Sequence, residues 1–164
     1  MQHEEKVRLW LGLCEDGCSR SDSEGRDEDT AISASTATEE EQEGMPSEPY
    51  LTAKAAAGSL ATLANDSTFA DLLVKEECAR TLVALLQSTD GNLIHRALVI
   101  IVELLSSKEE MSERYIVARH LMEGSIVPAM TAVGKSGSYQ HLGSLISDAV
   151  QALSDAMNSS SEDF

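Results

Sequence analysis

The chain has 164 residues, of which 42% are hydrophobic and 4% aromatic. That length is enough for one ordinary domain, and these proportions predict an all-α core built from Leu, Ile, Val and Ala. The net charge of −16 argues against a nucleic-acid or anionic membrane partner, because phosphate binding needs clustered Lys and Arg.

The cysteine content and the apolar segments indicate the cellular compartment. Three cysteines are too sparse and too odd in number for a disulfide framework. The mostly charged and polar residues 1–8 are not followed by the apolar region of a signal peptide. The longest apolar stretch, Ala97 to Val102, is too short to span a bilayer. We therefore expect a cytoplasmic protein with reduced thiols.

The first part of the chain divides into two segments. Residues 1–14 contain a short apolar run of helical character, which predicts the terminal helix of a preceding repeat. Residues 15–48 hold 12 acids and 2 bases and almost no large apolar side chain. Such a segment cannot bury enough surface to offset its ordering entropy, so we expect a disordered acidic loop. A solvated insertion without function and a regulatory tether both remain open for it.

Residues 49–157 alternate helical periods with short breaks, and we expect the polar tail at 158–164 to be disordered. In the first of these helices Gly58 follows three alanines, which predicts a close approach by another helix. The segment from Leu93 to Ser106 is apolar nearly all round, so it should be buried between two layers. The predicted helices span 50–65, 68–74, 76–87, 93–106, 109–122, 126–133 and 142–157.

Three residues are predicted to end or begin these helices. Ser67 and Ser107 precede helical segments and are expected to be N-caps, because a hydroxyl can accept from a free backbone N–H. Gly134 follows a helical segment and is expected to be a C-cap.

Some of the helical segments repeat. An offset of 41 residues places Leu60 on Ile101, and an offset of about 46 places residues 82–86 on residues 128–132. Periods of about 40–47 residues with two or three helices belong to armadillo and HEAT repeats. The three-helix rhythm favours an armadillo-type α-solenoid of about two to three units. A single irregular helical bundle remains the alternative.

Several stretches resemble a known family when they are taken together. These are Ala55–Leu63, His95–Ile100 followed by Leu104-Leu105, Val133–Lys135 before a variable loop, and Glu5–Leu9 leading to Leu13–Asp16. In order and spacing they are similar to the C-terminal end of UCS-domain myosin chaperones, over nearly the whole chain apart from residues 17–48. No single motif among them is specific.

The resemblance implies a cytosolic co-chaperone that binds the myosin motor domain and helps it fold and assemble. In that family a tetratricopeptide domain docks the ninety-kilodalton heat-shock chaperone. This sequence has no such repeat signature and no room for one, so we expect only the C-terminal, armadillo-repeat end of a UCS domain. The acidic segment departs from the short turn that is usual there.

No catalytic, cofactor-binding or metal-binding constellation is predicted, so we expect no enzyme activity. Cys14 and Cys18 lack the second ligand pair of a zinc site. The four histidines are scattered, and the stretch from Gly134 to Gly137 lacks the preceding glycine of a phosphate-binding loop.

Binding is therefore the predicted activity. In armadillo stacks the third helix of each unit lines a concave groove, and residues 77–87 and 126–135 are the candidates for that helix here. Plain solvated faces are an equally open interpretation of their polar positions. A myosin-directed chaperone, a generic armadillo scaffold or adaptor for another client, and an inert cap on the stack all remain open. His95 and Arg96 are expected either to cover the start of the buried helix or to present donors to a partner. The predicted protein-binding residues are Arg80, Thr81, Gln87, Asn92, His95, Arg96 and Thr131.

Overall fold

The computed structural model describes residues 2–19 and 48–158, and within these residues the chain is all-helical. Eight α-helices and one 3₁₀ helix follow one another in this described part of the chain. They are α1 (Gln2–Ser19), α2 (Glu48–Leu63), α3 (Ser67–Lys75), α4 (Cys78–Leu86), α5 (Gly91–Ser106), α6 (Met111–Glu123), α7 (Ile126–Lys135), the 3₁₀ helix η1 (Gly137–Leu142) and α8 (Gly143–Asn158).

The main departure from the predicted segments lies at the start of the chain. Helix α1 continues to Ser19, so the predicted boundary between a helix at 1–14 and a loop at 15–48 is wrong by five residues. The extra turn is helical because Cys18 is buried against the core. The remainder of the predicted acidic loop, 20–47, and the predicted tail beyond Asn158 lie outside the described residues.

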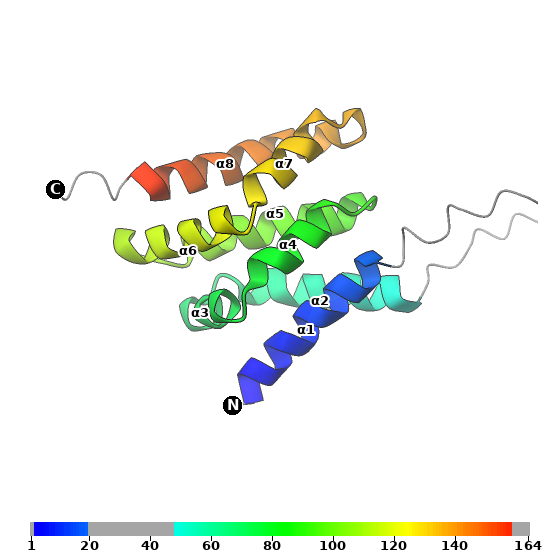
Figure 1. Ribbon diagram of the computed structural model, residues 1–164, viewed down its shortest axis with the longest axis horizontal. Helices are drawn as coiled ribbons and strands as arrows, with labels where there is room; N and C mark the ends of the chain where they lie inside the picture. Colours follow the sequence, from blue (N-terminus) through cyan, green and yellow to red (C-terminus); the bar gives the residue numbers. More distant parts are fainter. Residues whose placement is uncertain (1, 20–47, 159–164) are drawn as a thin grey trace, which may run out of the picture.

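The helices are arranged in three tiers (Figure 1), with α1 to α3 in the first, α4 to α6 in the second, and α7 and α8 in the third. Across the tiers, α2 packs against α5 and α5 against α8. In a parallel row, α1 packs against α4 and α4 against α7. One tier therefore covers the apolar faces of the next, which is how stacked helical units bury a continuous core.

Helix α5 is the centre of that core. It contacts α2, α4, α6 and α8, and this four-sided packing explains why its sequence is apolar nearly all round. The predicted burial between two layers is confirmed. Its fully buried side chains are Leu93, Ile94, Ala97, Leu98, Ile100, Ile101, Leu104 and Leu105.

The predicted 41-residue offset pairs several positions that are buried in both helical segments. Leu60 in α2 and Ile101 in α5 are both buried. Four further pairs at this offset are also buried at both positions, whereas Leu63 is half-buried and its counterpart Leu104 is buried. The further buried pairs are Ala53 with Ile94, Ala56 with Ala97, Ala57 with Leu98, and Ala64 with Leu105.

One unusual turn occurs twice at matching places. Glu77 before α4 and Ser125 before α7 are the non-glycine residues of the described chain with positive φ, at 56° and 67°. In the turn that ends at Glu77, the Glu76 N–H donates to the carbonyl four residues earlier. The Glu77 N–H donates to the carbonyl three residues earlier. The residues ending at Ser125 make the same two hydrogen bonds. The left-handed conformation is uncommon without glycine, so its recurrence marks two copies of one connection.

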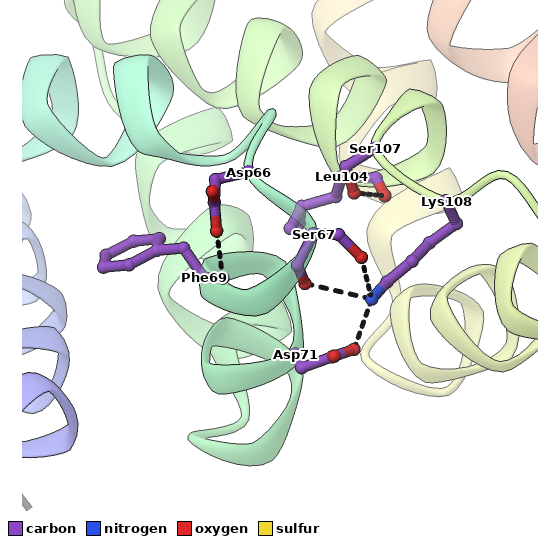
Figure 2. Close-up of polar contacts among 7 residues, drawn as sticks. All are labelled: Asp66, Ser67, Phe69, Asp71, Leu104, Ser107 and Lys108. Atoms are coloured by element: carbon purple, nitrogen blue, oxygen red, sulfur yellow. Dashed lines mark hydrogen bonds and ion pairs between the residues drawn. The ribbon is translucent and has the colours of Figure 1, made fainter.

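The N-caps differ from those predicted (Figure 2). The side chain of Asp66, one residue before Ser67, accepts from the Phe69 N–H at 2.9 Å and caps α3. The carboxylate of Asp66 also complements the helix dipole at this end of α3. The Ser107 hydroxyl donates back to the Leu104 carbonyl at 2.9 Å, so it closes α5 and does not begin α6.

The predicted C-cap is also displaced. Gly134 lies inside α7, which continues to Lys135 and is followed by Ser136 in an extended conformation. The chain turns without a left-handed glycine because a 3₁₀ helix begins directly afterwards.

A lysine that the sequence did not single out fastens the second tier to the first (Figure 2). The Lys108 side chain is 2% exposed, and its Nζ donates to the carbonyl and the hydroxyl of Ser67 at 3.0 and 3.1 Å. The same ammonium forms an ion pair with Asp71. Lys108 follows α5, and Ser67 is the first residue of α3. These bonds therefore hold the connection between α5 and α6 against the N-terminal end of α3.

The close approach predicted at Gly58 is made by a side chain. A Cβ at Gly58 would overlap the Arg96 guanidinium, which crosses from α5 and donates to the Lys54 carbonyl. A helix does approach α2 closely at another position, because a Cβ at Gly17 of α1 would overlap that of Ala53.

Candidate protein-binding site

A hollow of about 440 Å³ opens between α4 and α7. The two helices are the corresponding members of successive tiers, and each begins directly after a left-handed residue. Alanines on the α7 wall leave the room that larger side chains would fill. The apolar lining of this α4–α7 hollow is Val83, Leu86, Pro128, Ala129, Ala132 and Val133.

The side chains with polar groups that line the α4–α7 hollow are Gln87, Ser125, Ser136 and Tyr139. The Tyr139 hydroxyl is already engaged, because it donates to the Thr89 carbonyl at 2.7 Å. Gln87 is exposed, and its side-chain amide has no hydrogen bond to the described part of the chain. A primary amide carries both donors and an acceptor. Gln87 can therefore bond the backbone of an extended peptide laid across the hollow.

No charged side chain lines the α4–α7 hollow among the described residues. The nearby charges stand on the outer surfaces of the same helices, where Arg80 and Lys135 are both exposed. An uncharged apolar depression suits one apolar side chain of a partner, since burying an unpaired charge there would be costly. These features give the hollow the character of a subsite for an anchoring side chain.

Two predicted contact residues, Arg80 and Thr81, face α1. Thr81 is 2% exposed, and its hydroxyl donates to a carboxylate oxygen of Glu15 at 2.8 Å. In this structure α1 covers the position of Thr81 on α4, so its side chain is not open to a partner. The Arg80 guanidinium lies 3.7 Å from the same carboxylate. Because the Arg80 side chain is exposed, this guanidinium is also open to solvent.

Asn92 and His95 lie together at a second, smaller hollow. It measures about 360 Å³, and His141 forms another part of its wall. The side chains of Asn92 and His95 are exposed, as surface contacts would require. This hollow is lined by Gly91, Asn92, His95, His141 and Leu142 and shares no lining residue with the α4–α7 hollow.

The other two predicted residues make contacts within the chain. Arg96 is half-buried over α2 and donates to the Lys54 carbonyl. Thr131 is exposed, but its hydroxyl donates to the Val127 carbonyl at 2.8 Å. Of the seven predicted residues, Gln87 is the one that lines the α4–α7 hollow.

Sequence reasoning missed most of the residues that line the hollow. Pro128, Ala132 and Tyr139 lie on helical faces or in a turn where single positions carry no charge or catalytic group. One available signal was Tyr139, an aromatic residue isolated in a Gly/Ser-rich turn.

The cysteines are part of the core and not of the site. Cys14, Cys18 and Cys78 are all buried, and none of the three forms a disulfide bond with another described residue. Burial raises the pKa of the Cys14 thiol to about 12, with smaller contributions from Cys18 and Glu15. Burial also raises the pKa of Cys78 to about 12. A thiol that stays protonated at neutral pH is a poor nucleophile and a poor metal ligand.

His120 of α6 makes the stability of the chain depend on pH. Its Nε2 is buried without a hydrogen-bond partner, and desolvation lowers its pKa below the ordinary 6.5, against the weaker attraction of Glu77 and Glu123. The unfolded chain therefore binds the proton first, so stability present above pH 6.5 is lost as the pH falls below it. We expect the urea midpoint to drop from pH 7.5 to pH 5.5, and to drop less in His120→Gln.

The exposed His95 supplies the matched control for that measurement. His95→Gln should keep the pH dependence of the unsubstituted chain. An unchanged slope in His120→Gln would contradict the assignment of the proton to His120.

Within residues 2–19 and 48–158, no helix is both long and apolar enough to cross a membrane. The same residues contain no group of three or more His, Cys, Asp or Glu side chains placed to hold a metal ion. Comparison of the chain with family models, with curated proteins and with solved structures gives no match.

Proposed function

We propose that this chain is a protein-binding module of a UCS-type co-chaperone, and that it acts by binding and not by catalysis. In this proposal the three tiers are armadillo-type solenoid units. The single observation that carries it is the α4–α7 hollow, an uncharged apolar depression between corresponding helices of successive tiers. Concave solenoid surfaces bind extended segments through many modest contacts of this kind.

The repeated structure supports the armadillo part of the proposal. Two rows of helices run across the tiers, and the connection before α4 recurs before α7 with the same left-handed residue. Repeated units that share such a connection stack with a constant rotation, which leaves a continuous face for a partner.

The client that we propose is the myosin motor domain, and this choice depends on the resemblance of the sequence to UCS-domain chaperones. An apolar side chain of the client would enter the α4–α7 hollow, and Gln87 would bond the neighbouring backbone. The ninety-kilodalton heat-shock chaperone would be reached through a domain that is not in this chain. The excess of acids over bases disfavours nucleic acid and anionic membranes as partners. The cytoplasm is the compartment that fits such a partner.

A second candidate function is supported by the outer face of α8. This helix buries one stripe, formed by Ala149, Leu153 and Ala156, and exposes mostly polar side chains elsewhere. A polar outer face is what a helix needs to close the apolar end of a stack. In that case deletion of α8 would lower stability without lowering the affinity of the molecules that remain folded. A scaffold for another client is the alternative if the chain binds protein but not myosin.

The chaperone proposal is tested by the thermal aggregation of a myosin motor domain, followed by light scattering. We expect the intact chain to suppress aggregation. Ala132→Arg should weaken the suppression about tenfold or more, because it fills the hollow with a charge that the client side chain cannot displace. Ala132 is exposed, so the substitution should leave the fold intact.

Ser147→Arg on α8 is the matched control, because Ser147 is also exposed and lies outside the α4–α7 hollow. It should suppress aggregation as well as the unsubstituted chain. Absence of suppression by the intact chain, or equal suppression by both variants, would count against the proposal.

A further inference from the structure

The two helices that wall the α4–α7 hollow differ in charge from the chain as a whole. The full sequence has 28 acidic and 12 basic residues. Helices α4 and α7 contain no acidic residue, and each contains one base, Arg80 in α4 and Lys135 in α7. The walls of the hollow are therefore basic, although the chain is acidic.

Both bases are open to a partner. The Arg80 side chain is 84% exposed, and its contact with Glu15 spans 3.7 Å. An exposed ion pair of this kind contributes little to stability, so a second carboxylate can share or replace it. Lys135 is exposed and forms no ion pair with any residue of 2–19 or 48–158. Each base can therefore bind a carboxylate without the loss of a strong contact.

The acids that precede the two helices act on other groups. Glu76 pairs with Arg8 of α1. Glu77 before α4 and Glu123 before α7 both act on His120 of α6, where they oppose the fall of its pKa. The charge that a partner meets beside the hollow is therefore that of the two bases.

Arg80 and Lys135 lie at opposite ends of the hollow. Arg80 is one helical turn before Val83, and Lys135 is one turn after Ala132, so each base shares a face with a residue that lines the hollow. Helices α4 and α7 run in the same direction (Figure 1). The base on α4 is therefore at the end where the two helices begin, and the base on α7 is at the end where they finish.

The separation of the two bases sets the spacing of the acids that would pair with them. Arg80 is the third residue after the left-handed Glu77, and Lys135 is the tenth after the left-handed Ser125. The difference of seven residues is a rise of about 10 Å along the helices, and packed helix axes lie about 8–10 Å apart. The diagonal of about 14 Å corresponds to about four residues of extended chain. Residues i, i+2 and i+4 of an extended chain point to the same side.

We infer that the α4–α7 hollow recognises an extended protein segment with the pattern acid–x–apolar–x–acid. The central apolar side chain enters the hollow, and the two carboxylates pair with Arg80 and Lys135. The inference rests on the proposed function, because it takes the hollow as the place of a client's anchoring side chain. It adds the charge pattern that such a client segment carries.

Three blocked peptides test this pattern. They are Gly-Asp-Ser-Leu-Ser-Asp-Gly, its basic counterpart with Lys in place of both Asp, and an anchor-free version with Ser in place of Leu. Each is titrated into the full, ¹⁵N-labelled chain at 0.15 M salt, where exposed charges more than about 8 Å apart are largely screened. Chemical shifts of the backbone amides report both the affinity and the place of binding.

We expect the acidic peptide to shift the amides of α4 and α7 and to bind about tenfold more tightly than either of the other two. Binding of the basic peptide at equal or greater affinity would overturn the inference. So would equal binding of the anchor-free peptide, shifts confined to other helices, or no binding of the acidic peptide.

Reversal of the charge at Lys135 gives a sharper comparison, with Lys6 as the matched control. Lys6 on α1 is also exposed, has no ion pair within the described residues and lies outside the hollow. Lys135→Glu should weaken the acidic peptide about fivefold and strengthen the basic one, whereas Lys6→Glu should change neither by more than about twofold. A damaged fold would weaken both peptides, so only opposite changes support the inference, and equal effects of the two variants contradict it.

These measurements are separable from the test of the proposed function, which uses a myosin motor domain. Suppressed aggregation of the motor domain without a preference for the acidic peptide overturns the charge pattern and leaves the proposed function standing. A preference for the acidic peptide without suppressed aggregation supports the charge pattern and counts against the proposed client.

Discussion

Gly17→Ala is expected to lower the free energy of unfolding by about 2 kcal/mol, because overpacking a close contact typically costs about 1–3 kcal/mol. The added methyl group would overlap the Ala53 Cβ and press against the Pro49 carbonyl oxygen. Both obstacles belong to α2 and are not the flexible end of a side chain. Urea unfolding followed by far-UV circular dichroism measures the change.

Gly12→Ala in the same helix should have the opposite sign. A Cβ at Gly12 meets nothing within 4 Å, so the gain in helix propensity of about 1 kcal/mol remains uncompensated. Ala53→Gly should partly restore the stability of Gly17→Ala, since it removes the overlapping atom. Stabilisation by both Gly→Ala changes would contradict the close crossing of α1 and α2.

Lys108→Met is expected to destabilise the chain by about 2 kcal/mol, the usual effect of losing hydrogen bonds from a charged donor. Methionine keeps the apolar stem of the buried side chain but removes the ammonium that bonds Ser67 and pairs with Asp71. The hydroxyl and carbonyl of Ser67 would each lose a partner. Denaturant unfolding again measures the difference.

Lys75→Met is the control for Lys108→Met, because the Lys75 side chain is 62% exposed in its ion pair with Glu4. Exposed pairs contribute little to stability, so the unfolding midpoint should stay within error of the unsubstituted chain. Equal effects of the two Lys→Met changes would mean that burial of Lys108 does not matter.

The sequence was sufficient to predict the helices and the burial of α5, since periodic apolar positions report directly on packed faces. Capping was less predictable. Asp66 and Ser67 are adjacent and both suit an N-cap, so only the path of the backbone decides between them. Ser107 was misassigned for a similar reason, because a hydroxyl can bond either backwards or forwards along the chain.

Long-range contacts explain the other errors. Lys108 is buried by Ser67 and Asp71, which lie about forty residues earlier, and local sequence carries no sign of that pairing. Thr81 occupies a polar position on α4, but Glu15 of α1 covers it. The α4–α7 hollow needs two helices from different tiers, so no single segment could reveal it. Of the seven predicted contact residues, Gln87 alone is found in the lining of the hollow.

The claim that the α4–α7 hollow holds a client is tested most directly by site-specific photo-crosslinking. A photoreactive side chain is placed at Gln87, beside the hollow, or at the exposed Ser147 on α8, outside it. After irradiation with a myosin motor domain, denaturing gels and mass spectrometry identify the linked species. We predict a cross-link to the motor domain from position 87 and none from position 147. Cross-links from position 147 alone, or from neither position when the two proteins are mixed at tens of micromolar, would contradict the account.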